Sequence, residues 1–214
     1  MSHYDTIELE RLQAHDPGAI EGLLVEYSPI VYNYFLRMGL QPSVAEDLAQ
    51  ETFRRVWLAL QKFQGNSTLK TWILSIGRRV AFHHFKREKS RPDRVGLSDS
   101  LDRLMDWFDP NQPVLNPEQA FLQAERQYTL QTMLETLPSE EREVVVLHGL
   151  EELSQREVAD LMGRSLGWVN KTWQSACKRV KRKLLHMYRE SSASDFFAED
   201  LVRWHPQMAH MTRM

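Results

Sequence analysis

The sequence of 214 residues has little of several features that mark particular classes of protein. Its single cysteine, Cys177, excludes an internal disulfide and a zinc site built from thiolates alone within one chain. No apolar run approaches the roughly 20 residues that a helix needs to cross a bilayer. The first residues also lack the basic-then-apolar order of a secretory signal. We therefore expect a cytoplasmic protein without membrane insertion.

Sequence motifs for catalysis are missing as well. There is no glycine-rich phosphate loop, no nucleophile motif and no cluster of residues at metal-ligand spacing. The neighbouring His83 and His84 point to different sides of a helix, which argues against a shared metal. The sequence predicts a protein that is not an enzyme, with no cofactor and no metal.

The small net charge of −2 hides two basic stretches. Residues 78–94 contain seven Lys and Arg side chains against two carboxylates, and residues 164–189 contain eight with no carboxylate. Two basic stretches far apart in the chain predict two contacts with the phosphates of a nucleic acid. A solvated protein surface is the alternative interpretation of each.

Nearly every segment in which apolar residues recur at regular spacing is predicted to be a helix. Asp16 followed by Pro17 predicts a helix start, with apolar periodicity to about Met38. A capping box of Ser43 with Glu46 predicts the start of the next helix. One buried face of that helix is predicted to contain Phe53, Val56, Trp57, Leu60 and Phe63. After a break at residues 64–67, a helix is predicted over about 68–89, with its inward side chains at Trp72, Ile73, Ile76, Val80 and Phe85.

Prolines then interrupt any helix over residues 91–116, which are predicted to form a linker. Further helices are expected at approximately 117–137, 139–149, 154–162 and 165–187. No segment has a convincing strand pattern. The fold class that follows is all-α, with two helical domains joined by a flexible linker. The expected division is residues 1–90, the linker 91–116, residues 117–187, and a C-terminal extension of unknown role at 188–214.

The last two of these helices have the pattern of a helix-turn-helix. Ser154 and Glu157 form a capping box, Gly163 permits the turn, and Ser165 can cap the longer basic helix. An apolar seam is predicted from Val169, Trp173, Ala176, Val180 and Leu184. The side chains expected to face away are Asn170, Lys171, Gln174, Ser175 and Lys178. Asn and Gln can pair with adenine edges, and Lys with guanine acceptors or phosphate. A three-helix protein-docking domain is the alternative.

Three motifs, in chain order, carry a resemblance to a known family. They are AEDLAQETFRRVW at 45–57, FQGNSTLKTWI at 63–73, and LPSEEREV at 137–144 followed by the helix-turn-helix. They look like regions 2.2, 2.3–2.4 and 4 of sigma factors. The chain resembles the extracytoplasmic-function (ECF) group of the bacterial sigma-70 family over roughly 17–90 and 118–186.

The resemblance implies a sigma factor that binds core RNA polymerase and directs promoter recognition, DNA melting and transcription initiation. Its implied partners are the β′ clamp helices and β flap of core polymerase, promoter DNA and an anti-sigma factor. The implied polymerase-binding residues are Glu46, Asp47, Gln50 and Glu51. A helix-turn-helix transcriptional regulator that never joins polymerase is the alternative function.

The resemblance also implies two sets of DNA-binding residues. Those for the −10 element, where the family holds a flipped base, are Gln64, Asn66, Ser67, Thr68, Lys70, Thr71, Arg78, Arg79, Lys86 and Arg87. Those for the −35 element are Ser165, Asn170, Lys171, Gln174, Ser175, Lys178, Arg179 and Arg182. Polar residues replace basic ones that are common in the family along this helix. We therefore hypothesise a distinct −35 element read mainly by Lys171, Gln174 and Lys178.

Overall fold

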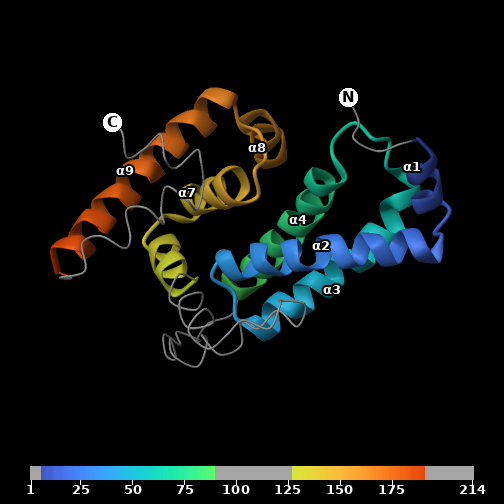
Figure 1. Cartoon of the computed structure of the whole chain (residues 1–214), viewed down its shortest axis with the longest axis horizontal. Helices are drawn as coiled ribbons and strands as arrows, with labels where there is room; N and C mark the ends of the chain where they lie inside the picture. Colours follow the sequence, from blue (N-terminus) through green and yellow to red (C-terminus); the bar gives the residue numbers. More distant parts are fainter. Residues whose placement is uncertain (1–5, 90–126, 191–214) are drawn as a thin grey trace, which may run out of the picture. The chain divides into compact units, whose positions relative to one another are not determined.

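A computed structural model of the chain describes residues 6–89 and 127–190 (Figure 1). The chain divides into two compact units, Met1–Glu125 and Arg126–Met214. These are called the N-terminal unit and the C-terminal unit below. The two described ranges contain helices and turns but no strand, in agreement with the predicted all-α class. The predicted linker 91–116 and the extension beyond residue 190 lie outside the described residues.

The N-terminal unit is built around three long helices with a short one at their end (Figure 1). Its elements are α1 (Thr6–Gln13), α2 (Pro17–Arg37), α3 (Pro42–Ala59), the 3₁₀ turn η1 (Leu60–Lys62) and α4 (Leu69–Lys89). Helices α2, α3 and α4 pack on one another, and α1 contacts α2 and η1. The largest fully buried side chains between them include Tyr34, Phe35, Leu60, Ile73 and Leu74. This core fixes α3 and α4, the two helices that contain the predicted functional residues.

One predicted helix start is confirmed and the other is wrong. The Asp16 carboxylate accepts a hydrogen bond from the Ala19 amide at 3.0 Å, and Pro17 follows as the first residue of α2. Helix α3, however, begins at Pro42 with Gln41 as its N-cap and has no side-chain capping bond. The predicted capping box of Ser43 with Glu46 is therefore absent. Proline at the first helical position needs no partner for its nitrogen, so the helix starts one residue before the expected cap.

The predicted buried face of α3 and the turn after it is confirmed in part: Val56, Leu60 and Phe63 are buried, but the inner face of α3 itself consists mostly of smaller residues. Its buried residues are Ala45, Ala49, Thr52 and Val56, and the small side chains let α4 approach closely. A Cβ added to Gly77 of α4 would lie 3.6 Å from the Thr52 Cγ2 atom. The hydroxyl of Thr52 is satisfied within its own helix, by donating to the Leu48 carbonyl at 2.7 Å. Trp57 was predicted to be buried and is 46% exposed, because Val56 takes the inward position beside it.

The C-terminal unit begins in the described residues with a helix over 127–135. It continues with α7 (Ser139–Val144), the π-helical turn η2 (Val145–Leu150), α8 (Gln155–Met162) and α9 (Leu166–Glu190). The predicted capping box is confirmed: Glu157 N donates to Ser154 Oγ at 3.2 Å, and Ser154 N donates to the Glu157 carboxylate at 2.9 Å. Gly163 has φ of +64° at the predicted turn, and Ser165 Oγ accepts from Trp168 N at 3.2 Å.

The predicted seam of α9 packs on the rest of this unit, except that the side chain of its last member, Leu184, lies outside the described residues. Val169 and Ala176 are completely buried and Val180 nearly so. The edge of the Trp173 ring lies over η2, where a Cβ added to Gly149 would approach it to 3.1 Å. The buried imidazole of His148 meets the same ring edge-on at a centroid distance of 4.7 Å. The absence of a side chain at Gly149 therefore leaves room for the Trp173 ring against η2.

A second long-range contact in this unit is made by Arg142 of α7. Its guanidinium donates to the carbonyls of Leu134, at 2.8 Å, and Glu135, at 3.2 Å. These oxygens lie at the end of the helix over 127–135, where the last carbonyls have no partner within the helix. Burial lowers the pKa of Arg142, although the guanidinium stays protonated at any physiological pH. The side chain thus ties the first described helix of the unit to α7.

Candidate nucleic-acid and partner-protein interfaces

An acidic and polar surface lies along the first half of α3. Glu46, Asp47 and Gln50 are all exposed there, while Ala45 and Ala49 on the opposite side are buried. Residues three and four apart share one side of a helix, so Glu46 and Gln50 are neighbours and Asp47 lies beside them. We call these three residues the α3 acidic surface. It could bind a basic partner protein through charge complementarity.

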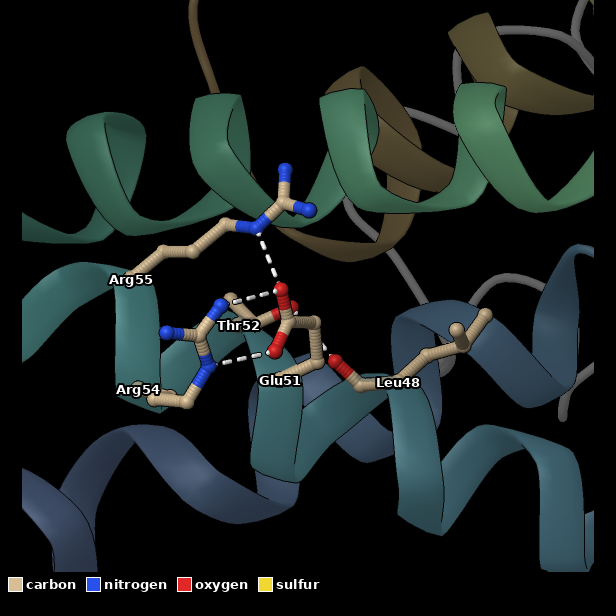
Figure 2. Close-up of polar contacts among 5 residues, drawn as sticks. All are labelled: Leu48, Glu51, Thr52, Arg54 and Arg55. Carbon is tan, nitrogen blue, oxygen red and sulfur yellow. Dashed lines mark hydrogen bonds and ion pairs between the residues drawn. The ribbon is translucent and has the colours of Figure 1, made fainter.

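Glu51, the fourth residue predicted for this surface, is engaged within its own helix (Figure 2). Arg54 donates from Nε to Oε2 at 2.7 Å and from Nη2 to Oε1 at 2.9 Å. Arg55 donates from Nε to Oε1 at 2.7 Å. Hydrogen bonds from Arg54, and then from Arg55, lower the pKa of Glu51 to about 2, and the same pairing raises the pKa of Arg54. Two guanidinium groups against one carboxylate leave this end of the surface cationic.

The loop before α4 has a fixed hydrogen-bonded conformation. Gly65 takes φ of +70°, and the Asn66 side-chain amide donates to Gln64 Oε1 at 3.2 Å. Thr68 caps α4: its hydroxyl oxygen accepts from the Thr71 amide at 3.1 Å and lies 2.7 Å from the Thr71 hydroxyl. Thr71 is buried, whereas Gln64 and Asn66 are exposed. Gln64 and Asn66 are therefore the side chains that a ligand can reach.

An aromatic pair closes the base of this loop. The rings of Phe63 and Trp72 have centroids 4.7 Å apart and are tilted by 35°. Phe63 is buried and Trp72 is half-buried. This placement agrees with the predicted inward position of Trp72, with one side of the residue open to solvent.

Basic side chains follow along α4. Arg79, Lys86 and Arg87 are exposed, whereas Lys70 and Arg78 are half-buried. Within the part of the chain that the structure describes, no three His, Cys, Asp or Glu side chains are placed to hold a metal ion. The exposed Lys and Arg side chains give α4 a cationic surface that is suited to binding phosphate groups.

Helix α9 presents a polar face opposite its apolar seam. Asn170, Lys171, Gln174, Lys178 and Arg182 are exposed, as is Ser165 at the helix start. The Gln174 side-chain amide donates to Asn170 Oδ1 at 3.2 Å, so the two exposed amide groups are bonded to each other. Such side chains can make bidentate bonds with base edges in a major groove.

Two other residues predicted for this face are turned toward α7 instead. Ser175 Oγ donates to Glu141 Oε1 at 2.8 Å, and Arg179 Nε lies 3.0 Å from Glu141 Oε2. The prediction that Ser175 faces away from its unit is therefore wrong. At the start of α7, Glu140 accepts from Arg164 Nη2 at 2.7 Å, and the Arg164 guanidinium lies 4.9 Å from the Trp168 ring centroid. Two carboxylates thus hold two cations of the helix-turn-helix within the unit.

The sequence did not predict the contacts of two polar residues near the start of the N-terminal unit. The side chains of Gln13 and His15 lie within hydrogen-bonding distance of the backbone carbonyls of Phe63 and Trp57. These pairs are 50 and 42 residues apart in the sequence. No local pattern could have indicated them, because the acceptor is a main-chain atom that every residue carries.

Two family profiles match the chain, one in each unit. Sigma-70 region 2 matches residues 23–91 and Sigma-70 region 4 matches residues 128–180, which together make up more than half of the chain. The N-terminal match contains the α3 acidic surface, the loop before α4 and the basic residues of α4. The C-terminal match contains the helix-turn-helix.

Named relatives cover most of both units. The chain is 28% identical over 167 residues to the RNA polymerase sigma factor YlaC of Bacillus subtilis, covering 78% of this chain and 92% of that protein. It is 26% identical over 185 residues to the ECF RNA polymerase sigma-E factor of Escherichia coli, covering 86% of this chain and 96% of the relative.

Two solved structures share the fold. CnrH, in complex with the cytosolic domain of CnrY, has a TM-score of 0.58 at 21% identity and covers 83% of this chain and 95% of its own. The sigma factor RpoE from Bartonella quintana, in complex with the anti-sigma factor NepR, has a TM-score of 0.57 at 18% identity. It covers 77% of this chain and 96% of its own.

Proposed function

The chain belongs to the extracytoplasmic-function group of the sigma-70 family, and from that premise we propose which of its residues perform each step of initiation. As a sigma factor it binds core RNA polymerase and directs promoter recognition, DNA melting and transcription initiation. Residues 1–90 and 117–187 act as the two functional domains in this proposal, with 91–116 as their tether.

The α3 acidic surface is the proposed docking site for polymerase. The observation that supports it is the contrast along α3: Glu46, Asp47 and Gln50 are exposed, whereas both oxygens of Glu51 are taken up by Arg54 and Arg55. Exposed carboxylates on a rigid helix offer complementary charge to a basic partner surface. Glu51 then acts by orienting the two arginines, which are themselves able to bond acidic groups of the partner.

Charge reversal tests this assignment. The purified chain is passed with core polymerase over a sizing column, and co-elution is measured for wild type and for Glu46→Lys with Asp47→Lys. A matched control, Glu21→Lys with Glu26→Lys, makes the same change of charge at exposed positions of α2. We expect the α3 variant to lose at least about tenfold in affinity, since like charges across an interface cost several kcal/mol, while the control binds as wild type.

The outcomes separate the family function from the residue assignment. Equal binding by wild type and the α3 variant would move the docking site elsewhere on the chain. A folded wild-type protein that fails to bind core polymerase would overturn the proposal as a whole. The helix-turn-helix regulator would then be the leading account, although it leaves the region 2 match of the N-terminal unit without a role.

Residues 64–68, which we call the −10 loop, are proposed to receive a base extruded from the −10 element. Gln64 and Asn66 offer exposed amide groups for its edge, and Trp72 lies at the base of the loop with one side open to solvent. Thr68 contributes by capping α4, and Arg79, Lys86 and Arg87 follow the phosphates along the helix. Asn66→Ala should weaken binding of a single-stranded −10 oligonucleotide by holoenzyme and leave core binding unchanged.

The exposed face of α9 is proposed to read the −35 element. Asn170, Lys171, Gln174 and Lys178 point away from the unit, whereas Ser175 and Arg179 are bonded to Glu141. Base readout should therefore depend mainly on the four side chains that point away: Asn170, Lys171, Gln174 and Lys178. Selection of −35 duplexes by the wild-type protein and by Gln174→Ala tests this, and an unchanged preference in the variant would contradict it.

Regulation and location complete the proposal. CnrH forms a complex with the cytosolic domain of CnrY, and RpoE forms one with the anti-sigma factor NepR; we propose that an anti-sigma factor binds this chain too. The chain itself performs no catalysis in this scheme, because phosphodiester formation belongs to the polymerase. It works in the cytoplasm, where polymerase and promoter are found. The described helices include none that is both apolar and long enough to cross a bilayer.

A further inference from the structure

The turn between α1 and α2 places two side chains against the backbone that leads into the −10 loop. Gln13 Nε2 donates to the Phe63 carbonyl at 2.7 Å in a half-buried position. His15 Nε2 lies 3.1 Å from the Trp57 carbonyl, and its ring lies over the Trp57 ring at a centroid distance of 4.1 Å. Both contacts reach the segment where α3 ends, η1 follows and the −10 loop begins.

The two carbonyl oxygens that accept these contacts lie at the ends of helical elements. Trp57 is in the last turn of α3, and Phe63 is the extended residue that terminates η1, with φ of −71° and ψ of 117°. Carbonyls at helix ends have no partner further along the helix and are satisfied by side chains, water or neighbouring elements. Here the α1–α2 turn provides the donors, and by doing so it fixes the direction in which the chain leaves η1.

The turn that presents these donors is itself well determined. His15 has φ of +56°, a left-handed conformation that non-glycine residues rarely adopt. The surrounding bonds maintain it: His15 N donates to the Leu12 carbonyl at 3.0 Å, and Asp16 N donates to the Arg11 carbonyl at 2.9 Å. Leu12 is 3% exposed and anchors α1 in the core. An unfavourable conformation that neighbouring contacts enforce is often tied to a functional arrangement.

We infer that Gln13 and His15 are positioning residues for the −10 loop. The far end of the loop is fixed by Thr68, which caps α4, and the near end by the Phe63 carbonyl bonded to Gln13. With both ends held, the exposed amides of Gln64 and Asn66 are presented in one arrangement before DNA arrives, which reduces the entropy lost on binding. The inference rests on the proposed −10 function. It extends that function to a segment preceding residue 23, where the family match begins.

The main test variant is Gln13→Met, which keeps the length and helix propensity of the side chain but removes its donor. The matched control is Gln61→Met, the same change at an exposed position of η1. Holoenzymes are compared on a single-stranded non-template oligonucleotide whose −10 sequence has been selected from a random pool by wild-type holoenzyme. Affinity for core polymerase, affinity for a duplex carrying only the −35 element, and Tm are measured in parallel.

We expect Gln13→Met to lower −10 affinity by about fivefold, corresponding to one neutral hydrogen bond. Core affinity, −35 affinity and the Gln61→Met control should stay at wild-type values. If Gln13→Met lowers Tm markedly, His15→Gly serves instead, because glycine adopts positive φ readily and only the ring contacts are lost. A selective loss of −10 affinity in His15→Gly is the same expected result.

Other outcomes count against the inference in distinguishable ways. Wild-type holoenzyme that selects no −10 sequence would overturn the proposed −10 function itself. A wild type that binds, with Gln13→Met and His15→Gly binding equally well, would overturn the positioning role alone. A parallel fall in core, −35 and −10 affinities would also overturn it, since it would show a general loss of fold.

Discussion

The two units pair their carboxylates in opposite ways. In the N-terminal unit, Glu51 bonds Arg54 and Arg55, three and four residues away on the same helix. In the C-terminal unit, Glu140 and Glu141 bond residues of the helix-turn-helix that are 24 to 38 residues away. The first arrangement needs only one helix to form. The second exists only when α7 and α9 are folded together.

This difference separates two uses of charge. Pairs within a helix adjust which sign of charge a surface presents, and they contribute little to tertiary structure. Pairs between elements fix the orientation of one element on another, even where the cation stays about half exposed, as Arg164 and Arg179 do. The N-terminal unit should therefore tolerate loss of the Glu51 ion pairs, whereas the C-terminal unit should respond to substitutions wherever α9 meets its neighbours.

The largest effect is expected at Gly149, where the Trp173 ring of α9 packs against η2. In Gly149→Val, the new side chain would meet the Trp173 ring, since even a Cβ approaches it to 3.1 Å. We expect the free energy of unfolding of the C-terminal unit to fall by about 1–3 kcal/mol, as for other overpacked cores. Urea denaturation followed by Trp fluorescence measures it.

The control for this prediction lies in the N-terminal unit. Gly22 of α2 has no heavy atom within 4 Å of an added Cβ, so Gly22→Val should change stability little or raise it slightly through helix propensity. Equal losses at Gly22 and Gly149 would show that the effect comes from placing valine in a helix and not from the contact with Trp173.

An intermediate effect is expected for Glu141→Gln. The substitution removes the charge facing Arg179, whose side chain is 49% exposed, and should cost about 1 kcal/mol of stability. It also releases Arg179 for phosphate, so the salt dependence of −35 duplex binding should steepen by about one unit of slope. Fluorescence anisotropy over a salt series measures the slope.

Two further variants test this interpretation. Asp160→Asn removes one carboxylate from the exposed side of α8 and should leave the slope as in wild type. Adding Arg179→Ala to Glu141→Gln should return the slope to its original value. A steeper slope that persists in the double variant would mean that another cation, and not Arg179, had been released.

The smallest effect is expected for Glu51→Gln. The Glu51 pKa of about 2 lies below its ordinary value of 4.5, because hydrogen bonds from Arg54 and Arg55 favour the charged form. The stabilisation is therefore fully present above about pH 4.5 and is lost as the pH falls toward 2. At pH 7 the variant should lower Tm by at most about 2 °C, because the pair is solvent-exposed.

The pH profile gives the check on this third prediction. The difference in Tm between wild type and Glu51→Gln should shrink as the pH is lowered from 4.5 and approach zero near pH 2. A difference that is constant across this range would show that the carboxylate charge plays no part.

Local signals made much of the fold predictable. Asp16 before Pro17, Ser154 with Glu157, and Gly163 each satisfy or permit a helix end by chemistry within a few residues, and all three occur in the structure. The start of α3 was missed because Pro42 needs no cap. Its inner face was predicted only in part: Val56 is buried as expected, but small residues such as Ala49 and Thr52 give a weaker apolar pattern than the exposed Trp57, although they are the ones that are buried.

The sequence predicted which residues belong to the candidate sites, but it did not predict which of them bond to neighbouring side chains. The sequence indicated that Glu51 and Ser175 belong to functional surfaces, but it could not tell whether neighbouring groups already occupy them. Whether the two adjacent arginines bond Glu51, or whether Glu141 reaches across to α9, depends on rotamers and helix packing. The contact of Gln13 with the Phe63 carbonyl is beyond any pattern, since it joins a side chain to main chain across the whole of α2 and α3.

Arg142 and Gln13 have one property in common: each bonds main-chain oxygens. A carbonyl is present whatever side chain its residue carries, so mutation can abolish such a contact from the donor's side only. Substitution of Phe63 or Leu134 would thus leave the acceptor of each bond in place, even though both side chains are themselves buried. The bonds that hold these two segments depend on the identity of Gln13 and Arg142, and not on the identity of the residues they hold.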